Sequence, residues 1–292
     1  MATWNVNSVK QRIPRLLPWL DERAPDVVCL QETKLADDAF YTVLGPEFAD
    51  RGYEFVHVGQ GQWNGVAILS RVGLDEVRHG FTGAPGYPEP ESAPEARAVS
   101  AICGGVRVYS LYVPNGREPD SDHYRYKLAW LDQLRQAVAD DGPEATMLCG
   151  DINIAPTDAD VFDPRSFAGH THVTEPERTA LRQIEDLGLT DVVRHRWPDD
   201  RVHSYWDYRA GMFHKDLGMR IDLILAGSSV AGRVAAAWVD RAARKGTKPS
   251  DHAPVIVDID TAPDGDIGPM VPPPSNPAGR SARSAKLPQA KD

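Results

Sequence analysis

The sequence predicts an α/β fold, because short apolar strands alternate with longer amphipathic helices. Continuous apolar runs at 27–30 and 146–149 are typical of strands covered on both faces. Residues 122–140 carry apolar side chains at helical spacing, and residues 177–187 indicate a second helix. The chain has 292 residues, 41% hydrophobic and 25% charged, which allows a sizeable core in one large or two small domains.

Further strands follow along the chain, separated by turn residues. The expected strands span residues 3–7, 27–30, 54–59, 65–70, 97–102, 106–113, 146–149, 189–193, 220–226, 234–239 and 255–259. Gly104 and Gly105 favour a hairpin between the two strands that flank them. Pro14 suits the first turn of a helix that continues to Leu20, and Pro18 then indicates a kink or a later start. Residues 82–96, rich in Pro, Gly and Glu, predict a surface loop.

Composition argues against several classes of protein. No apolar run approaches the ~20 residues of a membrane span, and the N-terminal residues carry no signal peptide, so a cytoplasmic protein is expected. Cys29, Cys103 and Cys149 lie far apart in apolar runs, which favours buried reduced thiols over disulfides or a zinc site. The net charge of −10 argues only weakly against a nucleic-acid partner, because bound Mg²⁺ and a local basic face can offset it.

Asp151 and Asn153 follow the predicted strand 146–149 and are two residues apart. In extended backbone this spacing points both side chains to the same side. A carboxylate beside a carboxamide at a strand end can activate a water and hold a phosphate oxygen. The alternative is an Asx turn that closes the strand, since Asp and Asn are common turn formers.

Other polar residues stand at the ends of the first predicted strands. Asn5 and Asn7 share a face of the first strand, and Glu32 emerges where a buried strand meets a loop, as metal ligands often do. Tyr112 and Asn115 end a third strand. The alternatives are a solvated strand end for Glu32 and a packed rim position for Tyr112.

A carboxylate and a histidine from the last third of the chain form a predicted pair. Asp222 lies among Ile and Leu residues, where an unpaired buried charge would be costly. His252, preceded by Asp251, is its expected partner. A carboxylate that holds an imidazole fixes its tautomer and raises its pKa, which suits a site that stabilises negative charge.

Residues 194–220 form a long irregular segment in which aromatic and basic residues alternate, including Tyr205, Trp206 and Arg209. This pattern suits a nucleic-acid surface, where rings stack on bases and cations meet phosphates. The alternative is a large packed loop with Trp206 in the core. We expect some of each.

The strand-end residues are drawn from the whole chain, and together they suit one reaction. They offer oxygen ligands plus one histidine and no cysteine, which favours Mg²⁺ or Mn²⁺ over zinc. A hard metal, a histidine, amides and a carboxylate base make a site for phosphate-ester hydrolysis.

These stretches, taken in order, resemble the exonuclease III family of abasic-site endonucleases, within the wider endonuclease/exonuclease/phosphatase superfamily. The matching motifs are WNVN at 4–7, LQETK at 30–34, YVPNG at 112–116, GDINI at 150–154, WDYR at 206–209, RID at 220–222 and SDHAP at 250–254. The resemblance implies a four-layer α/β sandwich, in which two mixed β-sheets pack face to face with helices outside. It implies a monomeric DNA-repair enzyme.

The resemblance also assigns roles to residues of this chain. It implies metal binding, with Glu32 as the main ligand, by Asn5, Glu32, Asp151, Asn153 and Asp251. It implies catalytic roles, with Asp151 activating the attacking water, for Tyr112, Asp151, Asn153, Asp222 and His252. It implies contacts with DNA or with the base-less sugar by Asn7, Asn115, Tyr205, Trp206, Arg209, Met219 and Ile221.

The implied activity is Mg²⁺-dependent hydrolysis of double-stranded DNA on the 5′ side of abasic sites, with 3′→5′ exonuclease activity and removal of 3′ blocking groups; Mn²⁺ can replace Mg²⁺. The expected location is the cytoplasm, on the nucleoid. The alternatives are a phosphoesterase of lipids or inositol phosphates from the same superfamily, or an inactive DNA-binding module. Residues 1–260 are expected to form the catalytic domain, and residues 261–292, rich in Pro, a disordered tail.

Overall fold

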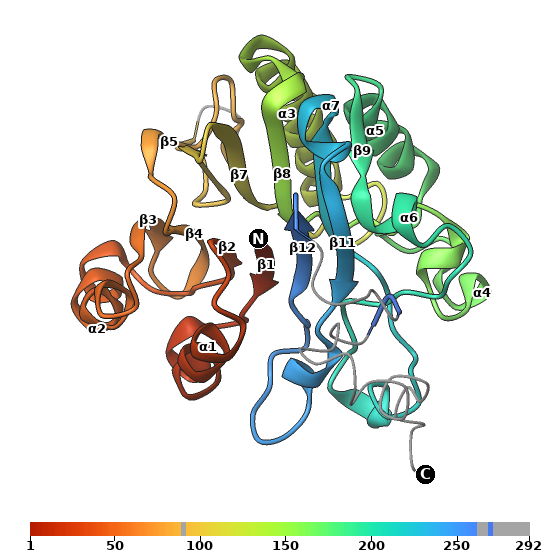
Figure 1. Cartoon of the computed structure of the whole chain (residues 1–292). Coiled ribbons are helices and arrows are strands. Elements are labelled where there is room, and N and C mark those ends of the chain that lie inside the picture. Colours follow the sequence, from red (N-terminus) through yellow and green to blue (C-terminus); the bar gives the residue numbers. More distant parts are fainter. Residues whose placement is uncertain (89–91, 262–267, 271–292) are drawn as a thin grey trace.

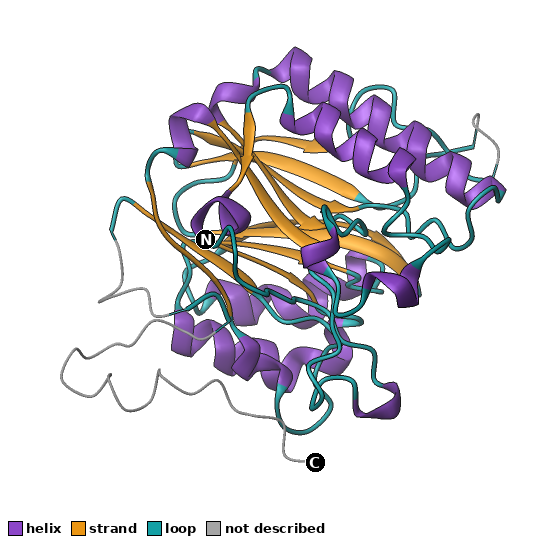
Figure 2. Ribbon diagram, turned by 90° about the vertical axis from the view of Figure 1, so that its right-hand side faces the viewer, coloured by secondary structure: helices purple, strands orange, loops and turns teal. Residues whose placement is uncertain are grey.

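Two mixed β-sheets lie face to face with helices on their outer sides (Figures 1 and 2). The structure is a computed structural model that describes residues 1–88, 92–261 and 268–270. Within these residues each sheet has six strands. The architecture confirms the predicted four-layer α/β sandwich.

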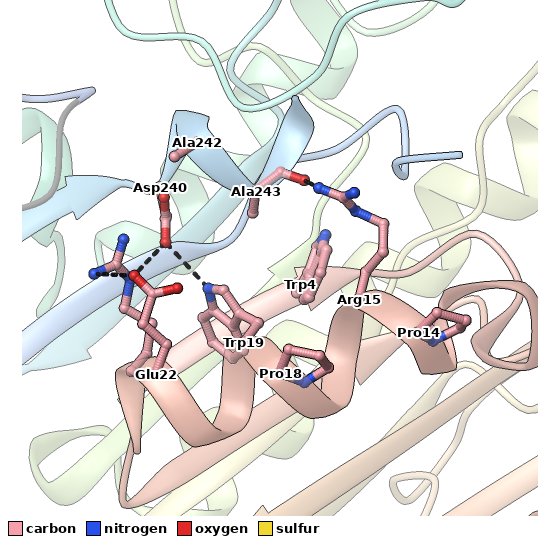
Figure 3. Close-up of a pocket in the computed structure, with 10 residues that line it drawn as sticks. Trp4, Pro14, Arg15, Pro18, Trp19, Glu22, Asp240, Ala242 and Ala243 are labelled. Carbon is pink, nitrogen blue, oxygen red and sulfur yellow. Dashed lines mark hydrogen bonds and ion pairs between the residues drawn. The ribbon is translucent and has the colours of Figure 1, made fainter. Parts of the chain in front are cut away.

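The first sheet combines the N-terminal strands with the last two strands. Its order is β11 (Val234–Val239), β12 (Val255–Ile259), β1 (Ala2–Asn5), β2 (Val27–Gln31), β4 (Trp63–Ser70) and β3 (Glu54–Gln60). Helices α1 (Val9–Arg23) and α2 (Asp37–Ala49) cover its outer face. Trp4 of β1 packs on Trp19 of α1, with ring centroids 5.3 Å apart, and Trp19 donates a hydrogen bond to Asp240 (Figure 3).

The second sheet is built from the middle of the chain. Its order is β5 (Asp75–His79), β6 (Ala98–Cys103), β7 (Val106–Tyr112), β8 (Thr146–Asp151), β10 (Asp222–Gly227) and β9 (Leu189–Asp191). Helices α3 (Asp122–Asp141) and α5 (Glu175–Glu185) cover its outer face. The remaining helices are short: α4 (Pro164–Phe167), α6 (Val192–Arg196) and α7 (Ser228–Ala231), with 3₁₀ turns η1 (Pro143–Ala145), η2 (Asp158–Asp160), η3 (Arg209–Gly211) and η4 (Arg241–Arg244).

The largest apolar cluster fills the space between the sheets. It includes Cys29 and Ile68 from the first sheet and Val99, Met147 and Cys149 from the second. Because these strands have a core on both faces, they carry the continuous apolar runs seen in the sequence. Cys29, Cys103 and Cys149 are buried free thiols, as predicted.

Several predicted boundaries are wrong, because packing overrides local preference. Helix α1 begins at Val9 and contains both Pro14 and Pro18 without a later start. Its buried face, including Leu16 and Leu20, holds it against β1 although Pro18 lacks the N–H that a regular turn requires. The first strand ends at Asn5 rather than at residue 7. The sequence analysis also missed α2 and β5.

The segment after the last strand is only partly described. Most of the predicted tail, residues 262–267 and 271–292, lies outside the described residues. Residues 268–270 pack against the domain: the Val239 N–H donates to the Pro269 carbonyl at 2.7 Å, and Met270 is buried. These three residues therefore contact the domain, and the division into a catalytic domain of residues 1–260 and a disordered tail of residues 261–292 stays a prediction. Among the described helices, none has the length and apolar character needed to cross a membrane.

Candidate active site

The polar residues that end the predicted strands lie at the same end of both sheets, because neighbouring strands pair in register. In the second sheet Asp151 of β8 lies opposite Tyr112 of β7 on one side and Asp222 of β10 on the other. In the first sheet Asn5 ends β1 beside the end of β2, and Glu32 follows directly. The two sheets thus bring residues that are more than 200 positions apart into one cluster.

A carboxylate cluster joins the two sheets. The Asn5 side-chain amide donates to Glu32 Oε1 at 2.8 Å and to Asp151 Oδ2 at 2.9 Å. Ligand atoms of Glu32, Asp151 and His252 all lie within 4.8 Å of one another. Carboxylate oxygens at this spacing fit a hard divalent cation, and the imidazole of His252 lies beside them.

A lysine ammonium forms an ion pair with one carboxylate of this cluster. Lys34 Nζ lies 2.6 Å from Glu32 Oε2 and donates to Asn7 Oδ1 at 2.6 Å. Burial acts to raise the pKa of Glu32, but the Lys34 ammonium and the Asn5 amide outweigh it and hold that pKa below its ordinary value. Glu32 therefore stays ionised and attracts a cation.

Asp151 has the opposite electrostatic character. Burial, together with the charges of Asp222 and Glu32, raises its pKa to about 7, although the charge of His252 opposes this shift. A carboxylate with a pKa near neutrality can accept a proton from water. The backbone N–H of Asn153 donates to Asp151 Oδ1 at 3.0 Å and so orients this carboxylate.

His252 and Asp222 form the predicted pair. His252 Nδ1 lies 2.8 Å from Asp222 Oδ2, while Nε2 faces Asp151 Oδ2 at 3.8 Å. Burial acts to lower the pKa of His252, but Asp222 and Asp151 overcome it and raise the pKa to about 10. The imidazole is therefore charged at neutral pH and can stabilise a phosphate oxygen. Ser204 Oγ accepts from the Asp222 N–H and fixes the start of β10.

Two amides extend the site beyond the carboxylates. Asn153 has a left-handed backbone (φ 54°), and its side-chain N–H donates to the Val113 carbonyl. Asn115 Nδ2 donates to Asn153 Oδ1 at 3.3 Å. Tyr112 is half-buried beside them, and burial together with Glu32 raises its pKa well above the ordinary value, so its hydroxyl stays protonated.

Two side chains, Asn7 and Lys34, separate Asp251 from the carboxylate cluster. Asn7 donates to Asp251 Oδ1 at 3.0 Å and accepts from Lys34, so Asn7 links Asp251 to Glu32 through the lysine. Within the described residues, Asp251 makes no hydrogen bond or ion pair with Glu32 or Asp151. Direct metal ligation by Asp251 and by Asn153 stays a prediction.

An apolar cluster borders the charged site. Met219 and Ile221 are buried together with Ala155 and Val161, and Tyr205 packs against them. The Tyr205 ring lies 4.9 Å from the His252 ring. The three predicted sugar-contacting residues, Tyr205, Met219 and Ile221, therefore share one apolar wall next to the histidine.

Trp206 is not a DNA contact, contrary to the prediction. Its side chain is fully buried, its indole N–H donates to Asp216 at 3.0 Å, and its ring packs edge-on against Phe213. A ring with no exposed face cannot stack on a base, so the packed-loop alternative is correct for this residue. Arg209 is exposed and pairs with Asp207, and its contact with DNA stays a prediction.

Sequence reasoning missed two residues of the site. Lys34 lies within the LQETK motif, yet its position beside Glu32 depends on the turn after β2. His172 accompanies the two amides: its Nδ1 lies 2.6 Å from the Asn153 carbonyl, and its Nε2 lies 3.4 Å from Asn115 Nδ2. No sequence signal marked His172, because it lies in an irregular segment with no predicted element.

A cation site of carboxylates, a charged histidine and converging amides defines a metal-dependent phosphoesterase. The comparisons agree: residues 2–252 match the Endonuclease/Exonuclease/phosphatase family, and the chain belongs to it. It is 28% identical over 259 residues to an exodeoxyribonuclease of Bacillus subtilis, covering 87% of this chain and 97% of that protein.

Solved structures give the same result. An AP endonuclease from Archaeoglobus fulgidus is 36% identical, with a TM-score of 0.82, over 89% of this chain and 98% of that one. A 3′-5′ exonuclease from Neisseria meningitidis is 37% identical, with a TM-score of 0.83, over 89% and 99%. A 3′ phosphatase from Neisseria, solved in complex with a product DNA hairpin, is also 37% identical with a TM-score of 0.83. The match covers 89% of this chain and 98% of the phosphatase chain.

Proposed function

We propose that this protein is a DNA-repair phosphodiesterase that hydrolyses the DNA backbone on the 5′ side of abasic sites and removes blocking groups from 3′ ends, with 3′→5′ exonuclease activity. The observation that carries the proposal is the convergence of Glu32, Asp151 and His252, whose ligand atoms lie within 4.8 Å of one another. The names of the similar proteins (exodeoxyribonuclease, AP endonuclease, 3′ phosphatase) support DNA as the substrate.

We assign the cation to Mg²⁺, with Mn²⁺ as a substitute. Glu32 and Asp151 offer carboxylate oxygens for it, and Asn5, whose side-chain N–H groups donate to both carboxylates, lies between them. When bound, the metal would supply charge stabilisation to the phosphate oxygens. The rest of the chemistry belongs to the chain: Asp151 takes the proton of the attacking water, and the charged His252, held by Asp222, binds a phosphate oxygen.

The amides and the apolar wall account for substrate placement. We assign the side-chain amides of Asn115 and Asn153, which contact each other, to hydrogen bonds with the phosphate. The wall of Tyr205, Met219 and Ile221 offers an apolar surface to a sugar that lacks its base. Because the net charge is −10, DNA binding depends on local cations and on the bound metal, and we expect affinity to fall with added salt.

The experiment uses three labelled duplexes: one with a single abasic-site analogue, one with a 3′-phosphate at a nick, and one with an ordinary recessed 3′ end. Each is incubated with Mg²⁺ or with EDTA, using wild type, Asp151→Asn and the control Asp240→Asn. Asp240 is a buried aspartate that pairs with Arg23 away from the site. We expect metal-dependent cleavage that Asp151→Asn abolishes and Asp240→Asn retains.

The three duplexes also rank the activities. No cleavage of the abasic duplex, with hydrolysis at 3′ ends intact, would limit the function to 3′-end processing. No cleavage of any duplex by folded protein that binds Mg²⁺ would overturn the DNA assignment, and inositol phosphates and sphingomyelin would be the next substrates.

A further inference from the structure

A fully buried ion pair lies beneath the two amides of the site. Lys127 of α3 and Glu177 of α5 are both inaccessible to solvent, and Lys127 Nζ lies 2.5 Å from Glu177 Oε1. The two helices run side by side on the outer face of the second sheet (Figure 2). Neither residue has a role in the proposed chemistry. Burial of two charges needs a reason, because a buried ion pair often adds no net stability.

The ammonium of Lys127 holds both amide-bearing loops. Besides Glu177, it donates to the Asn153 carbonyl at 2.7 Å and to the Asn115 carbonyl at 3.2 Å. A lysine ammonium has three N–H donors, and these three partners use all of them. One atom therefore joins the loop after β7, the loop after β8 and helix α5.

Glu177 organises the segment that carries His172. Its Oε1 accepts from Thr171 Oγ1 at 2.8 Å and from the His172 N–H at 3.0 Å. Its Oε2 accepts from the N–H and the hydroxyl of Thr174, at 3.1 and 2.5 Å. The carboxylate thus caps α5 and fixes residues 171–174 at the same time.

The contacts lead from Lys127 to the reacting groups. The Asn153 carbonyl oxygen accepts a hydrogen bond from Lys127 Nζ and lies 2.6 Å from His172 Nδ1. The Asn153 N–H donates to Asp151 Oδ1 at 3.0 Å. Asn153 also has a left-handed backbone, a conformation that Asn adopts more readily than most other residues because its short polar side chain can form local hydrogen bonds. A displacement of Asn153 would therefore move both its own amide and the Asp151 carboxylate.

We propose that Lys127 is a positioning residue that, with Glu177 as its counterion, places Asn115, Asn153 and Asp151 for phosphate-ester hydrolysis. The inference rests on the proposed function for the reaction, and on the hydrogen bonds of Lys127 for the mechanism. The positive charge of Lys127 strengthens its hold on the two loops, because charge-assisted hydrogen bonds are about twice as strong as neutral ones. Lys127 Nζ makes three of them.

The test compares Lys127→Met, Glu177→Gln and the double variant Lys127→Met/Glu177→Gln. Lys127→Met leaves the Glu177 carboxylate unpaired and is expected to lose stability. The double variant has no buried charge and similar volumes, so we expect it to regain a Tm near that of wild type. Its kcat should still fall about 100-fold, because displacement of a reacting group by about 1 Å costs that much.

Glu177→Gln separates positioning from ion pairing. It keeps the bonds from Lys127 to the Asn115 and Asn153 carbonyls, so we expect a kcat within about threefold of wild type and at least tenfold above that of the double variant. Equal losses in Glu177→Gln and Lys127→Met would overturn the proposal in favour of a purely structural ion pair. Asp240→Asn, which removes the carboxylate of the Arg23–Asp240 pair, is the control and should leave kcat unchanged.

A second readout does not depend on activity. The ¹⁵N-labelled side-chain amides of Asn115 and Asn153 should shift or broaden in the double variant and stay in place in Asp240→Asn. A double variant with wild-type kcat and unmoved amide signals would refute the positioning role. If wild type hydrolyses no phosphate ester, the proposed function fails, while these amide signals still decide whether Lys127 positions the two loops.

Discussion

Two buried aspartates, Asp151 and Asp160, show opposite electrostatic behaviour within the same fold. Burial acts to raise the pKa of both. For Asp160, Arg220 and Arg194 overcome burial and lower the pKa to about 2. For Asp151, the neighbouring carboxylates of Asp222 and Glu32 add to burial and the pKa rises to about 7. The difference lies in the partners and not in the depth of burial.

The two networks meet at the start of β10, where Arg220 and Asp222 are two residues apart. Around Asp160, two arginines balance two aspartates: Arg220 donates to Asp160 at 2.7 Å and to Asp191 at 2.6 Å, and Arg194 to Asp160 at 2.6 Å. Around Asp151, carboxylates outnumber cations, and Asp222 Oδ1 has no hydrogen-bond partner. In the balanced network each buried charge has a partner, whereas an excess of acid makes a site for a cation and for proton transfer.

The largest effect is expected from Asp151→Asn. The carboxamide keeps the shape and the hydrogen bond from Asn5 but cannot take a proton. We expect kcat to fall about 10²- to 10⁴-fold, which is the range for loss of a general base. Single-turnover cleavage of the abasic duplex measures it. The Tm should stay the same or rise, because one of several crowded carboxylates loses its charge; a large fall in Tm would show that Asp151 serves the fold instead.

Asp160→Asn should give the reverse result. It leaves the buried Arg220 with only Asp191 as a counterion, and breaking a buried ion pair typically costs about 3 kcal/mol or more. Urea unfolding should show this loss, with kcat per folded molecule within about threefold of wild type. In wild type, the contribution of Asp160 to the free energy of unfolding is complete above pH 3.8, its ordinary pKa, and is lost as the pH falls toward about 2. The variant should not show this loss of stability in acid.

Asp222→Asn tests the histidine pair. Without the carboxylate, the pKa of His252 should fall from about 10 toward its ordinary value, since Asp222 is the largest cause that raises it. We expect kcat to drop about 100-fold near pH 8, where the imidazole becomes neutral, with partial recovery at lower pH. NMR titration of the His252 ring protons measures the pKa directly. A ring that stays charged up to pH 9 in the variant would assign its charge to Asp151 rather than to Asp222.

The smallest expected effect is the change of stability and of Mg²⁺ affinity with pH. In metal-free protein the pKa of Asp151 is higher in the folded state than in the unfolded state. The contribution of Asp151 to the free energy of unfolding is therefore complete below pH 3.8 and is lost as the pH rises through about 7. Added Mg²⁺ should restore stability at high pH, because it binds the ionised carboxylate. We expect Mg²⁺ affinity to weaken up to about tenfold from pH 7 to pH 6, measured by calorimetry. Asp151→Asn should remove most of this pH dependence, and a wild-type affinity independent of pH would contradict the raised pKa.

The sequence predicted most strands and the polar strand ends, because both leave local signals. The apolar run that contains Cys29 marked a strand with a core on both faces, and Asp222 stood out as a carboxylate among apolar residues. The misses have a common cause. Pro18 indicated a helix that is kinked or starts later, but contacts with β1 hold α1 together from Val9. Trp206 lies in a segment whose composition suits both DNA and a core, and only packing decided for the core.

By itself, the sequence determined the fold class, the reaction chemistry and the residue types that carry it, because ordered motifs of oxygen ligands at strand ends suit one reaction. Only the tertiary structure decided which groups share a charge network. That Asp151 is crowded by acids while Asp160 is neutralised by arginines depends on the register of β8 and β10 and on the pairing of two sheets. Electrostatic energies depend on distances between residues far apart in the chain, and no local pattern encodes those distances.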